Sequence, residues 1–283
     1  MEDQTFELEP LCLFSESAVW QLNRDYYEKE GIRAWQNGTV PHHMTSNSMV
    51  GKTYAELILG LLRDLAQKGR TSETVYIMEL GAGHGRLAYH VLKHLEQLVA
   101  RLSIVLLPYC YIISDIAEES LSFFLEHPQL QPFFKQGKAD VCYFDATASD
   151  QIDLLYDKRT IAEEGLSQPL VLVANYFFDS LPIDLFYVKD KKLSSCLAAL
   201  YSDTDPAGLT EAELIEHMEI KFFKERVEAP FYEEPIYNEI LESYRNTIED
   251  SYIFFPVTGF KCLRNLENLS KEGVMLLSMD KGF

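Results

Sequence analysis

Short apolar segments that alternate with helical segments constrain the fold of this chain more than any other feature of its sequence. Four of them, at 75–78, 109–114, 139–144 and 169–174, have the length and the β-branched or aromatic content of buried strands. This alternation predicts βαβ units, which build a mostly parallel sheet with helices on both faces. We therefore expect an α/β fold whose ligands bind at the carboxyl ends of the strands.

Three parts are expected around this sheet: a helical segment before it, the core itself, and an inserted α+β elaboration. They span 1–70, 71–184 with 258–283, and 185–257. The insertion begins where the alternation of strands and helices stops, and we expect it to serve as a lid or a substrate-facing subdomain. A fifth buried strand, at 273–279, resumes the core. Sheets of this kind normally continue, so later strands either follow beyond this sequence or come from the insertion.

Composition limits the partners of the chain. Asp and Glu number 44 against 25 Lys and Arg, which gives a formal charge of −19 at pH 7. This charge repels phosphate backbones and anionic membranes, so we expect neither nucleic acid nor a membrane as a partner. The five cysteines form no CxxC pair, and no histidine has the spacing of a zinc partner, so we expect reduced thiols and no metal site. With an acidic N-terminus unlike a targeting segment, these features favour a cytoplasmic protein. The oligomeric state stays open.

A glycine-rich turn follows the first strand, in the sequence VYIMELGAGHGRLAYHV. Such a turn brings main-chain N–H groups at a helix N-terminus close to a ligand. Dinucleotide sites use GxGxxG with an acid about 20 positions further on, whereas this chain has GxGxG at Gly81, Gly83 and Gly85, and the next strand-end acid, Asp115, lies thirty residues past Gly85. A P-loop would need GK[ST], but Arg86 follows the last glycine.

Acidic residues lie at the ends of three consecutive predicted strands, and they suit a zwitterionic ligand without phosphate. Glu79 can balance the ammonium and sulfonium of S-adenosylmethionine, Asp115 can accept both ribose hydroxyls, and Asp145 can accept from the adenine amino group. The predicted cofactor-binding residues are Glu79, Gly81, Ala82, Gly83, Asp115, Ile116, Asp145, Ala146 and Asn175.

These segments resemble the motifs of class I S-adenosylmethionine-dependent methyltransferases. ELGAGHG resembles the first motif of that superfamily, YIISDIAEESL its second-strand motif and ADVCYFDAT its third-strand motif. The resemblance implies a Rossmann-like sheet, S-adenosyl-L-methionine as the cofactor, and transfer of its methyl group to an acceptor.

A narrower resemblance, over about residues 20–185 and 258–283, is to the MidA-like family, which includes the protein-arginine methyltransferase that assists assembly of mitochondrial complex I. VANYFFDSLPIDLF resembles the NEFFDALP segment of that family, TSNSMVGKTYAELI its pre-sheet segment, and GVMLLSMDKG its fifth-strand segment, which ends in DYG. Two positions depart from the pattern: Tyr176 replaces a glutamate beside Asn175, and Lys281 replaces the tyrosine of DYG. Because a glutamate there would hold a guanidinium, arginine is not carried over as the substrate.

Asn175 and Asp179 are the predicted catalytic residues. Methyl transfer is an in-line displacement at an activated carbon, so the protein mainly positions the acceptor and excludes water. Asn175 would act through its side-chain or main-chain carbonyl, and Asp179 as a base or an orienting carboxylate. In the alternative interpretation, Asp179 caps a helix that starts at Ser180.

The sequence thus predicts a methyltransferase that acts on a protein or small-molecule acceptor, and two alternatives stay open. NYFF faintly resembles the NPPY segment of enzymes that methylate amino groups of DNA bases or glutamine, although both prolines are missing. The second alternative is a non-catalytic interaction module that keeps the fold and the cofactor and docks through residues 185–257.

Overall fold

The computed structural model describes residues 5–33, 45–70, 72–102, 105–227 and 230–280, so Lys281 lies outside the described residues. The chain divides into two compact units, one made of residues 24–180 and 260–283 and the other of residues 1–23 and 181–259. The sequence divides the chain differently, into residues 1–70, a core and an insertion, and that division into domains stays a prediction. In the structure, residues 1–23 belong to the same compact unit as the inserted region.

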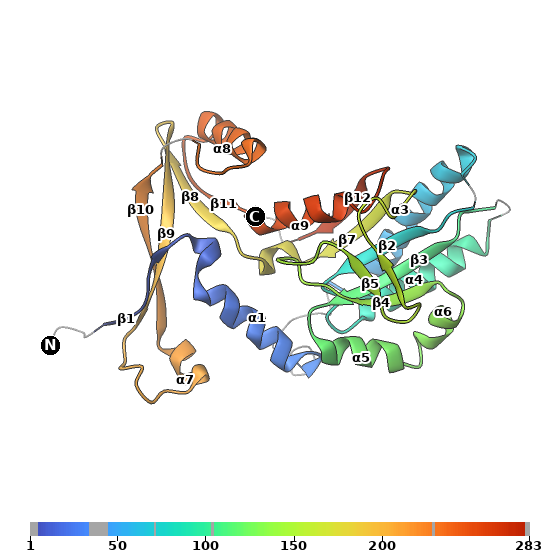
Figure 1. Cartoon of the computed structure of the whole chain (residues 1–283), viewed down its shortest axis with the longest axis horizontal. Coiled ribbons are helices and arrows are strands. Elements are labelled where there is room, and N and C mark those ends of the chain that lie inside the picture. The colour runs from blue at the N-terminus through green and yellow to red at the C-terminus, as the bar shows by residue number, and fades with distance from the viewer. Residues whose placement is uncertain (1–4, 34–44, 71, 103–104, 228–229, 281–283) are drawn as a thin grey trace. The chain divides into compact units, whose positions relative to one another are not determined.

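A five-stranded parallel sheet forms the centre of the first unit (Figure 1). Its strands are β2 (Val75–Leu80), β3 (Tyr109–Asp115), β4 (Ala139–Tyr143), β7 (Leu170–Asn175) and β12 (Val274–Met279). They are ordered β12-β7-β2-β3-β4, and all four pairs are parallel. The chain order reverses at β2, so the gap between β2 and β7 is the switch point of a Rossmann-like sheet. The predicted α/β fold is confirmed.

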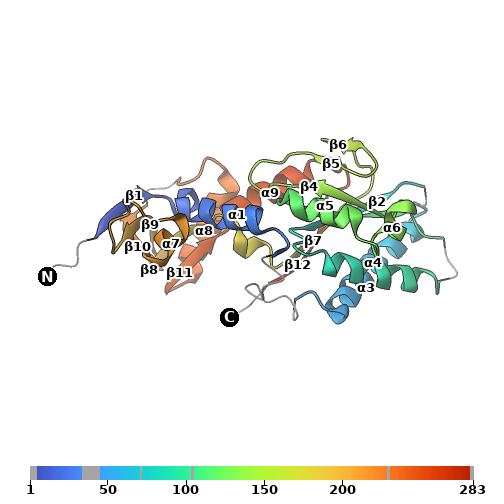
Figure 2. The same cartoon turned by 90° about the horizontal axis from the view of Figure 1, so that it is seen from below.

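Four helices cover one face of this sheet, and their apolar stripes form the main core. They are α3 (Ser48–Gln67), α4 (Arg86–Val99), α5 (Glu118–Glu126) and α6 (Gln131–Lys135). In α3 the fully buried Ala55, Ile58 and Leu62 recur at helical spacing, and Asn47 caps the helix by accepting from the N–H groups of Met49 and Val50. Figure 2 shows α9 (Val257–Glu267) on the opposite side of the sheet from α3 and α4.

An antiparallel sheet forms the second unit. Its strands are β1 (Phe6–Cys12), β8 (Asp184–Lys189), β9 (Lys192–Ser202), β10 (Met218–Arg226) and β11 (Asp250–Phe255). Strands β8 and β9 form a hairpin, with Asp190 and Lys191 of its turn both at positive φ, as tight two-residue turns require. The unit also holds η1 (Phe14–Glu16), α7 (Glu211–Glu216) and α8 (Pro235–Thr247), and α1 (Ala18–Glu30) begins in it.

Two features of the structure were not predicted. The polar connection at 148–168 holds a small hairpin of β5 (Ile152–Leu154) and β6 (Arg159–Ile161), whose three-residue strands are too short to show a periodic pattern. Strand β1 was also missed, because Pro10 interrupts its alternation and its partner β9 lies far along the chain.

Candidate active site

The candidate site lies at the carboxyl ends of β2 and its neighbours β3 and β7, where the strand order reverses. The glycine turn leaves β2 here and leads into α4. Gly81, Gly83 and Gly85 all have positive φ, at 63°, 59° and 69°, which explains why the turn needs glycine. A Cβ on Gly81 would lie 2.9 Å from Phe177, and a Cβ on Gly85 would lie 2.8 Å from Phe124. The rings of Phe177 and Phe124 therefore pack directly against the turn and leave no room for side chains at these two glycines.

Ser114 on β3 ties the turn to the sheet. Its main-chain carbonyl accepts from the N–H of Ala82 at 2.8 Å, and its hydroxyl donates to the carbonyl of Glu79 at 2.6 Å. Ser114 itself is fully buried. The position of the turn is thus set by β3 as well as by β2.

Asp115 faces the turn from the end of β3. Its Oδ2 accepts from the N–H of Gly83 at 2.8 Å and its Oδ1 from the N–H of Ala117 at 3.0 Å. Burial raises the pKa of this carboxyl to about 6, against the lowering effect of the main-chain hydrogen bonds. Each oxygen keeps a further lone pair, so the carboxylate is held in place and can still accept from hydroxyls.

Glu79 is buried at the end of β2. Its side chain is 3% exposed, and the hydroxyl of Tyr111 donates to Oε2 at 2.9 Å. Burial raises the pKa of Glu79 to about 8, the Tyr111 hydrogen bond opposes the shift, and the charge of Asp115 adds to it. Glu79 is therefore mostly protonated at neutral pH until a cation comes close.

Asp145 follows β4 and lies near Asp115, because the N–H of Phe144 donates to the Asp115 carbonyl at 3.1 Å. Its Oδ1 accepts from the N–H and the hydroxyl of Thr147, and its Oδ2 accepts from Nη1 of Arg24 at 2.6 Å. Burial alone would raise the pKa of Asp145, but the hydrogen bonds from Thr147 and Arg24 lower it. Asp145 is thus an ionised, anchored carboxylate. Among the other predicted residues, Ala146 is buried and Ile116 is half-buried.

Sequence reasoning missed Arg24. It lies on α1, 121 residues before Asp145, and its sequence neighbours carry no signal for the pairing. Only the tertiary structure brings the two together.

The carboxyl end of β7 carries Asn175 and Tyr176. The Asn175 amide is held on both sides, because Nδ2 donates to the Thr45 carbonyl at 3.1 Å and Oδ1 accepts from the Tyr54 hydroxyl at 3.3 Å. Tyr176 is 40% exposed and has a φ of 55°, a left-handed conformation that is rare for a bulky residue. Its N–H donates to the carbonyl of Met279 at 2.8 Å. Strained backbone of this kind gathers at functional sites.

Asp179 lies inside the short helix η2 (Phe178–Ser180), and β8 starts at Asp184. The alternative in which Asp179 caps a helix from Ser180 is therefore wrong, because no helix starts there in this described stretch. Asp179 is exposed, and its pKa is raised, first by partial desolvation and then by the charge of Asp280. A carboxyl with a raised pKa is a better proton acceptor than an ordinary surface carboxylate.

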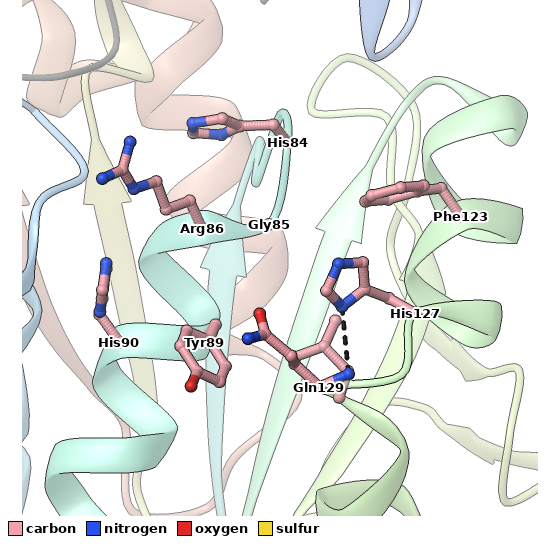
Figure 3. Close-up of a pocket in the computed structure, with 9 residues that line it drawn as sticks. His84, Gly85, Arg86, Tyr89, His90, Phe123, His127 and Gln129 are labelled. Atoms are coloured by element: carbon pink, nitrogen blue, oxygen red, sulfur yellow. Dashed lines mark hydrogen bonds between the residues drawn. The ribbon is translucent and has the colours of Figure 1, made fainter.

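A cavity of about 350 Å³ lies beside the glycine turn (Figure 3). It is lined by Gly85 with residues of α4 and of α5 and its following loop, and sequence reasoning did not predict it. The only sequence signal is the helical spacing of Arg86 and His90.

A comparison with known protein families matches residues 57–280 to a family described as "Putative S-adenosyl-L-methionine-dependent methyltransferase". The chain belongs to this methyltransferase family. The cofactor named in the description of this family, S-adenosyl-L-methionine, is the one predicted from the sequence. At the level of the family, the predicted methyltransferase superfamily, enzyme class and cofactor are therefore confirmed.

Two solved structures from Burkholderia thailandensis are similar to this methyltransferase family member. The first, an uncharacterised protein, has 16% identity and a TM-score of 0.47, with 94% of this chain and 56% of that chain covered. The second, of the same superfamily and bound to S-adenosyl-homocysteine, has 17% identity and a TM-score of 0.45, with 82% of this chain and 46% of that chain covered. The chain thus spans about half the length of each. No curated protein matches it.

Within the ranges that the structure describes, no helix has the length and apolar character to cross a bilayer. No group of three or more His, Cys, Asp or Glu side chains that could hold a metal ion was found among the same residues.

Proposed function

We propose that the chain transfers the methyl group of S-adenosyl-L-methionine to a protein or small-molecule acceptor at the carboxyl ends of β2, β3 and β7. The observation that carries this proposal is the hydrogen bond from Gly83 to the Asp115 carboxylate, next to buried Glu79. This arrangement places Asp115, an acceptor for ribose hydroxyls, close to Glu79, which can pair with a cationic group.

The residues present fit this cofactor. Glu79 is a buried acid that would ionise beside a cation, and the left-handed glycines Gly81 and Gly83 present main-chain atoms without side chains next to it. When bound, the cofactor supplies a methyl group on a positively charged sulfur. Asp115 would hold the ribose, and Asp145, fixed by Arg24 and Thr147, would take the adenine amino group through a remaining lone pair.

Asn175, Tyr176 and Asp179 would form the acceptor side. Asn175 is fixed by Tyr54 and Thr45, so its Oδ1 can orient an acceptor N–H or O–H with little loss of entropy. Asp179 would take the proton that the acceptor loses as its lone pair forms the bond to the methyl carbon. The exposed Tyr176 ring would limit access to the site.

Arginine is not proposed as the acceptor, because Tyr176 offers no carboxylate to a guanidinium. The narrower MidA-like resemblance, the cytoplasmic setting and the lack of nucleic-acid and membrane partners stay predictions from the sequence.

Two measurements test the proposal. Calorimetry should show saturable binding of S-adenosyl-L-methionine, and Asp115→Ala should abolish it while Asp64→Asn, an exposed acid on α3, leaves it unchanged. A folded protein that fails to bind the cofactor would refute the proposed site.

Transfer of a labelled methyl group to components of a cell extract then separates an enzyme from the non-catalytic interaction module. Labelled product that disappears in Asp115→Ala supports the enzyme. Binding without any turnover supports the module instead.

A further inference from the structure

The cavity beside the glycine turn is separate from the cofactor residues predicted above. Its lining from the described residues contains none of Glu79, Gly81, Asp115, Asp145 or Asn175. Figure 3 shows Arg86 and Tyr89 of α4 on one wall, and Phe123 and His127 across from them. At about 350 Å³, the cavity falls in the range of small-molecule sites.

Hydrogen-bond donors gather in this lining, together with the one positive charge of Arg86. Arg86 contributes a guanidinium, and His84, His90 and His127 contribute three imidazoles, whereas no Asp or Glu is found among the lining side chains that the structure describes. This local excess stands out in a chain with a net charge of −19. Arg and His donors of this kind bind the oxygens of phosphates and carboxylates.

His90 and His127 lie on opposite sides of the cavity, and each can donate a hydrogen bond to an anion. Burial lowers the pKa of His90, and the charges of Arg86, His94 and Lys93 lower it further, so at neutral pH the ring is uncharged and offers an anion one N–H donor. The Nδ1 of His127 accepts from the N–H of Gln129 at 3.3 Å, so the neutral ring carries its proton on Nε2 and can donate it.

The remaining lining is mostly aromatic and aliphatic, with the amide of Gln129 added to it. Phe123 and Tyr89 lie on opposite walls, and Leu130 adds an aliphatic surface. Phe123 is 37% exposed, so part of its ring is accessible to a ligand in the cavity. A ligand with an apolar body and one oxyanion group would match this lining, because the body would contact the aromatic and aliphatic side chains and the oxyanion would accept from the Arg and His donors.

We propose that this cavity binds a phosphate monoester with an aromatic body, the phosphate bonded to Arg86, His90 and His127 and the body placed between Tyr89 and Phe123. Donors on two walls suit the three terminal oxygens of a phosphate better than the two oxygens of a carboxylate. The site does not depend on methyl transfer, because it shares no predicted cofactor-binding residue with the candidate active site.

Phenyl phosphate, titrated into the full chain and followed by calorimetry, tests this proposal. We expect it to bind at least tenfold more tightly than benzoate, inorganic phosphate or phenol. Arg86→Gln and His90→Gln should each weaken binding about tenfold, whereas Arg63→Gln, an exposed arginine of α3, should not change it. Phe123→Leu should weaken binding of phenyl phosphate and leave that of inorganic phosphate unchanged. Thermal melts confirm that each variant is folded.

Three results would overturn the proposal. Phenyl phosphate could bind no more tightly than its two halves, the variants Arg86→Gln and Phe123→Leu could both keep the original affinity, or S-adenosyl-homocysteine could displace phenyl phosphate. The last result would place the ester in the cofactor site. Loss of cofactor binding with phenyl phosphate binding intact would refute the proposed methyltransferase site alone.

Discussion

The N–H of Gly83 donates a hydrogen bond of 2.8 Å to the carboxylate of Asp115, which lies 32 residues further along the chain. This bond joins the glycine turn after β2 to the end of β3. It explains why a turn with three left-handed glycines keeps one conformation, and why the acid that ends β3 points toward the turn.

The first prediction concerns this bond. Asp115→Asn keeps one oxygen acceptor but loses the charge and one of the two N–H partners, so S-adenosyl-L-methionine should bind about 10- to 100-fold more weakly, a change of roughly 1–3 kcal/mol. Calorimetry with the purified variant measures the change, and Asp64→Asn serves as the matched control. Equal affinities in the two variants would contradict the role given to Asp115.

Glu79 gives a prediction about pH and stability. Its pKa is raised from 4.5 to about 8, so the folded protein holds a proton that the unfolded chain releases between these values. Stability should therefore fall as pH rises from about 4.5 to about 8 and then level off. Glu79→Gln keeps an acceptor for Tyr111 and removes this loss, so its melting temperature at pH 8 should exceed that of the unchanged protein.

The same carboxyl should release its proton when a cationic cofactor binds. Proton release at pH 7 can be measured by calorimetry in buffers with different ionisation enthalpies, and Glu79→Gln should abolish it along with most of the affinity. A cofactor that binds the unchanged protein without any proton release would show that Glu79 does not face its positive charge.

Arg24 and Asp145 give a third prediction. The pair lies at 2.6 Å with side chains 28% and 11% exposed, so Arg24→Gln should destabilise the protein by about 1–3 kcal/mol. The looser pair of Arg33 and Glu119, at 3.9 Å and more than half exposed, is the control, and Arg33→Gln should cost less than about 0.5 kcal/mol. Urea unfolding of both variants compares them.

This pair also predicts a pH dependence. Because the folded-state pKa of Asp145 is lowered from 3.8, its contribution is present above that value and is lost as pH falls through the lower folded-state pKa. The difference in stability between the unchanged protein and Arg24→Gln should therefore shrink below about pH 4. A difference that stays constant down to pH 2 would assign the effect to packing.

Gly85 gives the fourth prediction. Gly85→Ala places a Cβ at a φ of 69° and 2.8 Å from the ring of Phe124, so we expect a loss of about 1–3 kcal/mol. Gly60 in α3 has open space around its Cβ position, and Gly60→Ala should stabilise the protein by about 0.5–1 kcal/mol. Opposite shifts in melting temperature would confirm the requirement for glycine in the turn.

Much of the fold could be predicted from the sequence, because the strands of a parallel sheet are continuous apolar runs. Asp115 is the last residue of β3, and Asp145 comes two residues after β4. The hydrogen bonds and ion pairs that those two acids make could not be predicted from the sequence. Whether Asp145 is free or bonded to Arg24 depends on a pairing across 121 residues, for which periodicity carries no information. The basic cavity was missed for the same reason, since Arg86 and His127 meet only after α4 and α5 have packed on the sheet.

The pairing of β1 with β9 has a consequence during synthesis. The two strands join residues such as Phe6 and Ser202, so β1 lacks its partner until almost 200 further residues have been synthesised. At typical ribosomal speeds that interval is roughly ten to forty seconds. During it, the nascent β1 has an unpaired backbone edge, and a chaperone bound to β1 would protect it from association with other chains.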